Sequence, residues 1–72
     1  MSKNVCFKLG RQIRYLRGKY NLTQEELAHR ANISTKYLQN LEGKKPKVAS
    51  IITLEKLAKG FGIPLWEFLR IK

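Results

Sequence analysis

The stretch of this chain that most constrains its fold runs from Thr23 to Glu42, and it predicts two short helices joined by a tight turn. Thr23 and Glu26 have the spacing of a capping box, in which the two residues satisfy each other's backbone N–H groups at the start of a helix. The apolar residues that follow recur at helical spacing and form one buried face: Leu27, Ala28 and Ala31. This pattern predicts a first short helix that begins just after Thr23.

The turn and the second short helix follow directly. Asn32 tolerates a turn conformation, and Ile33 can fill the angle between the two helices. Ser34 is a suitable N-cap for the next helix, which would bury Leu38 and Leu41. Its opposite face carries hydrogen-bonding side chains: Thr35, Lys36, Gln39 and Asn40. Two short helices that expose such a face fit the major groove of DNA.

The rest of the chain predicts three further helices, so the expected fold class is all-α, a compact five-helix bundle in one domain over residues 1–72. The first helix is expected from Val5 to about Lys19. Its inward stripe would be Val5, Leu9, Ile13, Leu16 and Tyr20. Gly10 inside this helix costs about 1 kcal/mol relative to Ala, which predicts that another helix packs closely there.

Two helices are expected after the second short one, which ends at Gly43. Ser50 would cap a fourth helix to about Lys59, whose inward residues would be Ile51, Leu54, Leu57 and Ala58. Pro64 is expected in the first turn of a last helix, Leu65 to Leu69. The apolar residues of this end exceed what one buried face can cover: Ile63, Leu65, Trp66, Phe68, Leu69 and Ile71. We therefore predict a homodimer interface formed by Leu65, Phe68 and Leu69, with Trp66 turned more inward.

The formal net charge of +10 comes from fifteen Lys and Arg residues against five acidic residues, all of them Glu. A small basic protein of this kind most often meets a polyanion. Charge alone fits DNA, RNA, a membrane surface, an acidic protein or a merely basic domain. Exposed aromatic residues for base stacking do not accompany the basic face, which makes RNA the weaker hypothesis.

Several functions are not expected from this sequence. Cys6 is single, which excludes an intramolecular disulfide and a multi-cysteine zinc site, and it is best interpreted as a small apolar packing residue rather than a redox thiol. His29 is interpreted as a surface residue. We see no nucleophile–base pair, no metal-ligand set and no glycine-rich phosphate loop, so we expect no enzyme activity, cofactor, metal or small-molecule ligand. No apolar segment resembles a signal peptide or a membrane span, so a cytoplasmic protein is expected.

At its motifs the chain resembles the lambda-repressor/Cro-like helix-turn-helix family. The matching segments are residues 13–17, 22–28, Ile33-Ser34, Leu41-Glu42 and 53–58. The resemblance implies that the third helix is a recognition helix and that Arg17 and Glu42 form a structural ion pair. It also implies a set of base-contacting residues: Thr35, Lys36, Tyr37, Gln39 and Asn40.

Physical chemistry agrees with these implied roles. Lys36 can donate to guanine, Asn40 can pair with adenine, and the hydroxyl and methyl of Thr35 suit a thymine edge. The alternative is that this polar stripe is merely solvated. Gln24, at the start of the second helix, matches a position that binds a phosphate with the help of the helix N-terminus. The basic loop would contact phosphates on the other flank: Lys44, Lys45 and Lys47.

The sequence departs from the family pattern at one point, because Glu42 directly precedes Gly43 where one residue usually separates the two. This leaves open whether the basic loop is solvated or faces DNA. The predicted function is a homodimeric regulator of transcription on a palindromic double-stranded DNA operator, similar to restriction-modification controller proteins or small phage repressors. Glu25 and Glu26 lie where an activator of this family could meet RNA polymerase. The alternative is an antitoxin-like module whose last helix masks a partner protein.

Overall fold

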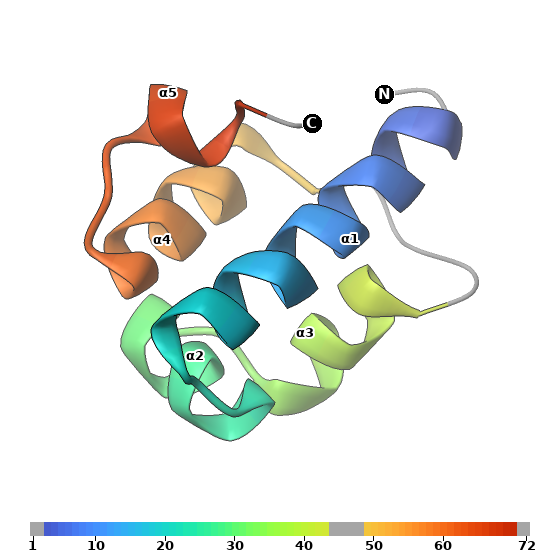
Figure 1. The fold of residues 1–72 in the computed structure, drawn as a ribbon. Coiled ribbons are helices and arrows are strands. Elements are labelled where there is room, and N and C mark those ends of the chain that lie inside the picture. Colours follow the sequence, from blue (N-terminus) through green and yellow to red (C-terminus); the bar gives the residue numbers. More distant parts are fainter. Residues whose placement is uncertain (1–2, 44–48, 71–72) are drawn as a thin grey trace.

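A computed structural model describes residues 3–43 and 49–70, and this part of the chain is all-helical, with no β-strand (Figure 1). The five helices are α1 (Lys3–Tyr20), α2 (Gln24–Ala31), α3 (Thr35–Glu42), α4 (Ile51–Phe61) and α5 (Leu65–Phe68). The long α1 crosses the bundle diagonally, with α2 and α3 below it and α4 and α5 on its other side (Figure 1). The predicted five-helix bundle is confirmed. The loop residues Lys44, Lys45 and Lys47, and Ile71, lie outside the described residues.

Three hydroxyl side chains define where α2, α3 and α4 begin. The Thr23 hydroxyl accepts a hydrogen bond from the Glu26 N–H at 3.1 Å, and the Glu26 carboxylate accepts one from the Thr23 N–H at 3.0 Å. Ser34 caps α3 at 3.0 Å and Ser50 caps α4 at 3.1 Å in the same way. These caps were predicted, because each satisfies N–H groups that have no acceptor within the first helical turn.

The turn between α2 and α3 is set by one residue. Asn32 has a φ of 57° and a ψ of 45°, the left-handed conformation that Asn tolerates better than most residues. Its backbone N–H donates to the carbonyls of Ala28 and His29, and the Ile33 N–H donates to Ala28 at 3.0 Å. These bonds end α2 and turn the chain directly into α3.

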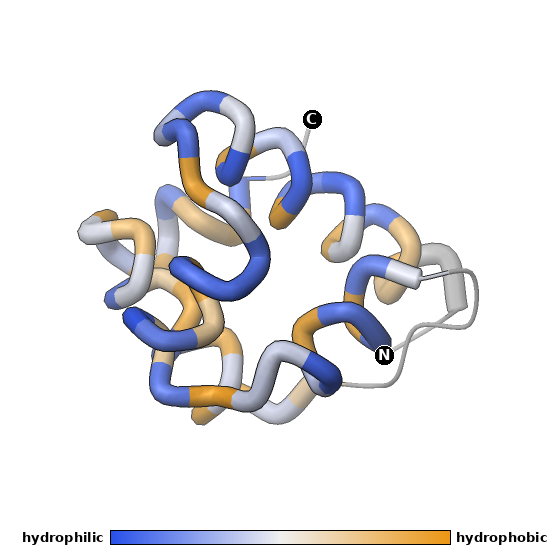
Figure 2. Tube along the Cα trace, turned by 90° about the horizontal axis from the view of Figure 1, so that it is seen from below, coloured by the Kyte–Doolittle hydropathy of each residue, from blue (hydrophilic) through white to orange (hydrophobic). Residues whose placement is uncertain are grey.

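The hydrophobic core draws on all five helices. The largest fully buried side chains are Ile13, Leu27, Leu38, Leu41, Leu57 and Phe68. Hydrophobic and hydrophilic segments alternate along the helices, as expected when each helix buries one face (Figure 2). Leu38 and Leu41 place one side of α3 in this core, so its opposite side is left facing outward.

The predicted inward stripe of α1 is wrong at both ends. Val5 and Tyr20 are 41% and 38% exposed, whereas Cys6 and Gln12 are buried. Both residues lie near the ends of α1, where the core covers less of each side chain. Tyr20 still packs its ring on that of Phe61, with centroids 6.0 Å apart. Ile51 was also predicted to be inward but is 56% exposed at the start of α4.

Gly10 explains how closely α1 and α3 approach. A Cβ atom at Gly10 would lie 2.6 Å from the backbone oxygen of Leu41 and 3.4 Å from the Cα of Glu42. No side chain fits between the two backbones at this point. The close packing that was predicted from this glycine is confirmed, and it holds the end of α3 against the middle of α1.

The orientation of α5 corrects the predicted dimer surface. Phe68, predicted to lie at the interface, is completely buried, whereas Trp66, predicted to turn inward, is 67% exposed. Phe68 packs on the ring of Phe61 with centroids 5.9 Å apart, and its carbonyl oxygen accepts a hydrogen bond of 3.4 Å from the buried amide of Gln12. Because α5 has only four residues, one aromatic residue can face the core, and a side chain two positions earlier points nearly the opposite way.

Candidate nucleic-acid interface

The outer face of α3 presents four polar side chains to solvent. Lys36 and Gln39 are exposed, and Thr35 and Asn40 are half-buried at the edges of this face. Because Leu38 and Leu41 anchor the inner side of α3, the outer side chains are carried on a fixed backbone. Together they offer an ammonium group, two carboxamides and a hydroxyl, which are the groups that hydrogen-bond to base edges in the major groove.

Tyr37 differs from the other predicted base-contacting residues. It is half-buried and packs against the core, and its hydroxyl lies 3.4 Å from the hydroxyl of Thr53. Thr53 in turn lies 3.1 Å from the Ser50 hydroxyl that caps α4. Tyr37 therefore connects α3 to the start of α4. The sequence showed no sign of this contact, because it joins two residues on separate helices.

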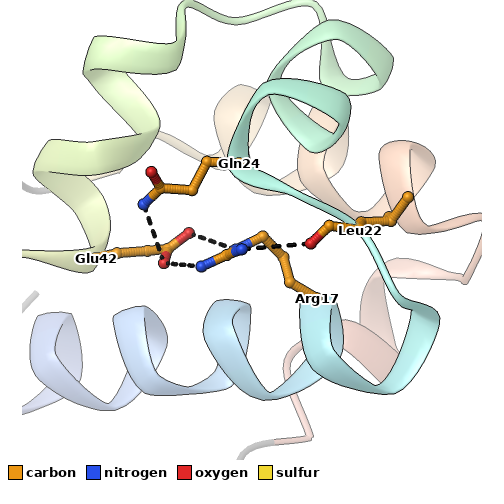
Figure 3. Close-up of polar contacts among 4 residues, drawn as sticks. All are labelled: Arg17, Leu22, Gln24 and Glu42. Atoms are coloured by element: carbon orange, nitrogen blue, oxygen red, sulfur yellow. Dashed lines mark hydrogen bonds and ion pairs between the residues drawn. The ribbon is translucent and has the colours of Figure 1, made fainter.

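A network of polar contacts among four residues joins α1, α2 and α3 beside this face (Figure 3). The Arg17 guanidinium donates to both carboxylate oxygens of Glu42, from Nη2 at 2.7 Å and from Nε at 3.0 Å. Its Nη1 donates to the backbone oxygen of Leu22 at 3.3 Å. The Glu42 side chain is only 4% exposed, so its charge is compensated almost entirely by Arg17.

Gln24 joins the same network from the first position of α2. Its Nε2 donates to the Glu42 carboxylate at 3.4 Å, which orients the amide (Figure 3). The second hydrogen on Nε2 is available for another acceptor. The backbone N–H of Gln24 precedes the first acceptor within the helix, and the positive end of the helix dipole lies at the same place. The geometry suits an anion such as a phosphate.

The capping box stabilises the N-terminus of α2 and lowers the pKa of one carboxyl group. Hydrogen bonds from the Thr23 N–H and then the Thr23 hydroxyl lower the pKa of the Glu26 carboxyl, with a smaller contribution from the charge of Arg30. Glu26 therefore remains charged under mildly acidic conditions. Its engagement with Thr23 directs its negative charge to the N-terminus of α2.

Two other kinds of site are absent from residues 3–43 and 49–70. In these segments no group of three or more His, Cys, Asp or Glu residues is placed to hold a metal ion. No helix of the described chain is both long and apolar enough to cross a membrane.

The arrangement of helices is shared with structures of known proteins. The restriction-modification controller protein C.AhdI from Aeromonas hydrophila is 28% identical, with a TM-score of 0.80 over 88% of this chain and 94% of that protein. The controller protein C.Esp1396I, solved on a 19 base pair DNA duplex, is 26% identical with a TM-score of 0.80 over 90% of this chain and 89% of that one. The same protein on a 25 base pair operator site gives the same identity and TM-score.

Sequence comparison gives the family directly. No curated protein sequence matches this chain significantly. A helix-turn-helix family model matches residues 13–68, which extend from the middle of α1 to the end of α5. The chain therefore belongs to the helix-turn-helix family, in its lambda-repressor/Cro-like form.

Proposed function

We propose that this protein is a sequence-specific regulator of transcription that binds double-stranded DNA as a homodimer, in the manner of a restriction-modification controller protein. The observation that carries the proposal is the polar outer face of α3, fixed by buried leucines and flanked by the N-terminus of α2. The structures of C.Esp1396I on a DNA duplex and on an operator site support it. We propose a cytoplasmic role that involves no catalysis.

In this proposal, α3 contacts bases and the segments beside it contact the DNA backbone. Lys36, Asn40 and Thr35 supply the base contacts, with Gln39 beside them on the same face. The Tyr37 hydroxyl can both donate and accept a hydrogen bond, and it uses one of these with Thr53. It contacts DNA only if it leaves Thr53 or makes a second hydrogen bond. Gln24 supplies a phosphate contact, and Lys44, Lys45 and Lys47 would supply others.

The dimer surface that we propose is the outer side of α5, corrected for the burial of Phe68. Leu65 and Leu69 are one helical turn apart; Leu65 is half-buried against the core, and Leu69 is 39% exposed. Leu65 also lines a groove of about 240 Å³ between α4 and α5, together with the apolar Ala58, Ile63 and Pro64 and the charged Glu55 and Lys59. Covering this apolar strip with a second copy would give the dimer the two-fold symmetry that a palindromic operator needs.

Selection from a pool of randomised DNA duplexes at defined salt concentration tests the proposal. We expect a two-fold symmetric consensus with half-sites about 10 bp apart, or a multiple of that spacing, because the symmetry of a dimer is imposed on its operator. An asymmetric or single-stranded consensus would contradict the homodimer on a palindrome. Enrichment of no duplex at all would contradict sequence-specific DNA binding.

A further inference from the structure

We propose that Arg14 of α1 is an additional phosphate-binding residue of the DNA interface, acting beside Gln24. The inference rests on the proposed function and adds to it a residue from a helix to which no DNA contact was assigned. The ligand is a phosphate of the duplex backbone, so the contact stabilises the complex without distinguishing one base sequence from another.

Arg14 lies on the face of α1 that contacts α3. Gly10, Arg14 and Arg17 are spaced by four and three residues, which places them on one face of the helix. Gly10 lies against the backbone of Leu41, and Arg17 binds the side chain of Glu42. Arg14 thus lies between the two points at which α1 contacts the last residues of the recognition helix. Its exposure shows that its side chain extends away from this seam into solvent.

The charge of Arg14 is not paired within the described residues. Arg17 does not supply a free cation to this face, because its guanidinium is directed to Glu42 and to the backbone oxygen of Leu22. Glu42 is likewise occupied by Arg17 and Gln24. Within the described residues, Arg14 forms no ion pair or hydrogen bond of its own. It is the cation of this face whose charge remains uncompensated.

Gln24 lies beside the same face of α1. The Gln24 amide reaches the same Glu42 carboxylate that Arg17 holds, so the N-terminus of α2 lies beside this face of α1 (Figure 3). Residues three apart on a helix have Cβ atoms about 5–6 Å from each other. The Cβ of Arg14 therefore lies about that far from the Cβ of Arg17, which belongs to the network. A DNA strand whose phosphate binds at Gln24 therefore passes near a free guanidinium. Arginine can bind a phosphate through two parallel N–H donors.

The experiment compares the salt dependence of DNA binding for Arg14→Ala, Arg14→Lys and a control, Lys8→Ala. Lys8 is an exposed cation on the same helix, about 120° around the axis from Arg14, so the control removes the same charge from another face. Affinity is measured between 50 and 200 mM salt on two probes, poly(dI-dC) and the duplex recovered by the selection. Far-UV circular dichroism establishes that each variant is folded.

We expect Arg14→Ala to weaken binding to both probes by the same factor. The slope of log K against log salt should decrease in magnitude by about 0.9 for each bound half-site. Over the fourfold change in salt, wild type would then lose about 3.5-fold more affinity per half-site than Arg14→Ala. Arg14→Lys should retain the wild-type slope, and Lys8→Ala should do the same.

Two other outcomes are informative in different ways. A folded Arg14→Ala variant with the wild-type slope, or with the same change in slope as Lys8→Ala, would overturn the role of Arg14. In either case, wild-type binding to the selected duplex would leave the proposed function intact. If wild type itself recovered no duplex in the selection, the proposed function would fail before Arg14 was tested.

Discussion

Gly10 and Gly18 lie eight residues apart on α1, and the structure gives them different surroundings. The place of a Gly10 side chain is filled by the backbone of α3, whereas a Cβ at Gly18 would meet nothing within 4 Å. Both glycines carry the same conformational entropy cost in a helix. Only Gly10 therefore has a packing reason to be glycine.

Substituting these two glycines should change stability in opposite directions. Gly10→Ala should lower the free energy of unfolding by about 1–3 kcal/mol, because α1 and α3 would have to separate to admit the methyl group. Gly18→Ala should raise it by about 0.5–1 kcal/mol through helix propensity. Urea unfolding of both variants measures the difference. Equal effects of the two substitutions would show that α1 and α3 do not pack as closely as described.

At the proposed base-contacting residues, one substitution should lower both affinity and specificity. Replacing Asn40 or Lys36 with Ala should cost about 1–3 kcal/mol per half-site and relax specificity at one or two base pairs. Repeating the duplex selection with each variant would show the relaxed positions directly. If specificity stayed intact while affinity fell evenly, these two residues would be phosphate contacts rather than base contacts.

At the scale of elements, the helix starts and the turn that the sequence predicted well are set by neighbours in the chain. The caps at Thr23, Ser34 and Ser50 and the turn at Asn32 each depend on hydrogen bonds within five residues. The contacts of Tyr37 and Gln12 join residues 16 and 56 positions apart, and no local pattern indicates them. The sequence therefore located α3 and its exposed face, while the bonds that hold Tyr37 required the folded chain.

The capping box of α2 should make stability depend on pH. The pKa of Glu26 is lowered in the folded protein, so its contribution to stability is present above the ordinary pKa of Glu, about 4.3, and is lost as the pH falls through the lowered value. Glu26→Ala should therefore be less stable than wild type at pH 7, and the difference should shrink on acidification. Urea midpoints measured from pH 7 to pH 2 provide the comparison. Glu26→Gln, which keeps an acceptor but no charge, serves as the control. A gap between wild type and Glu26→Ala that stays constant over this range would show that the charge of Glu26 does not contribute.

At the scale of the whole molecule, the sequence predicted an excess of apolar surface at the C-terminal end but not its distribution. Phe68 and Trp66 exchange their predicted places, because the short α5 can turn only one aromatic side chain toward Phe61. Hydrophobicity alone does not distinguish the two residues. The rotation of α5 is set by packing against α4 and by the bond from Gln12, which are properties of the assembled bundle.

This distribution gives a test that separates folding from dimerisation. Leu69→Glu should leave a folded monomer, because Leu69 is already 39% exposed and its replacement disturbs little of the core. Losing the burial of its exposed part costs about 1 kcal/mol per subunit, so the dimer dissociation constant should rise roughly 30-fold for the two subunits together. Phe68→Ala should instead destabilise the fold itself by about 3–5 kcal/mol. Sedimentation equilibrium and thermal unfolding distinguish the two effects, with Leu69→Met as a variant expected to remain dimeric. A Leu69→Glu protein with the wild-type dimer dissociation constant would place the two-fold contact elsewhere on the molecule. Operator affinity should then be unaffected by this substitution.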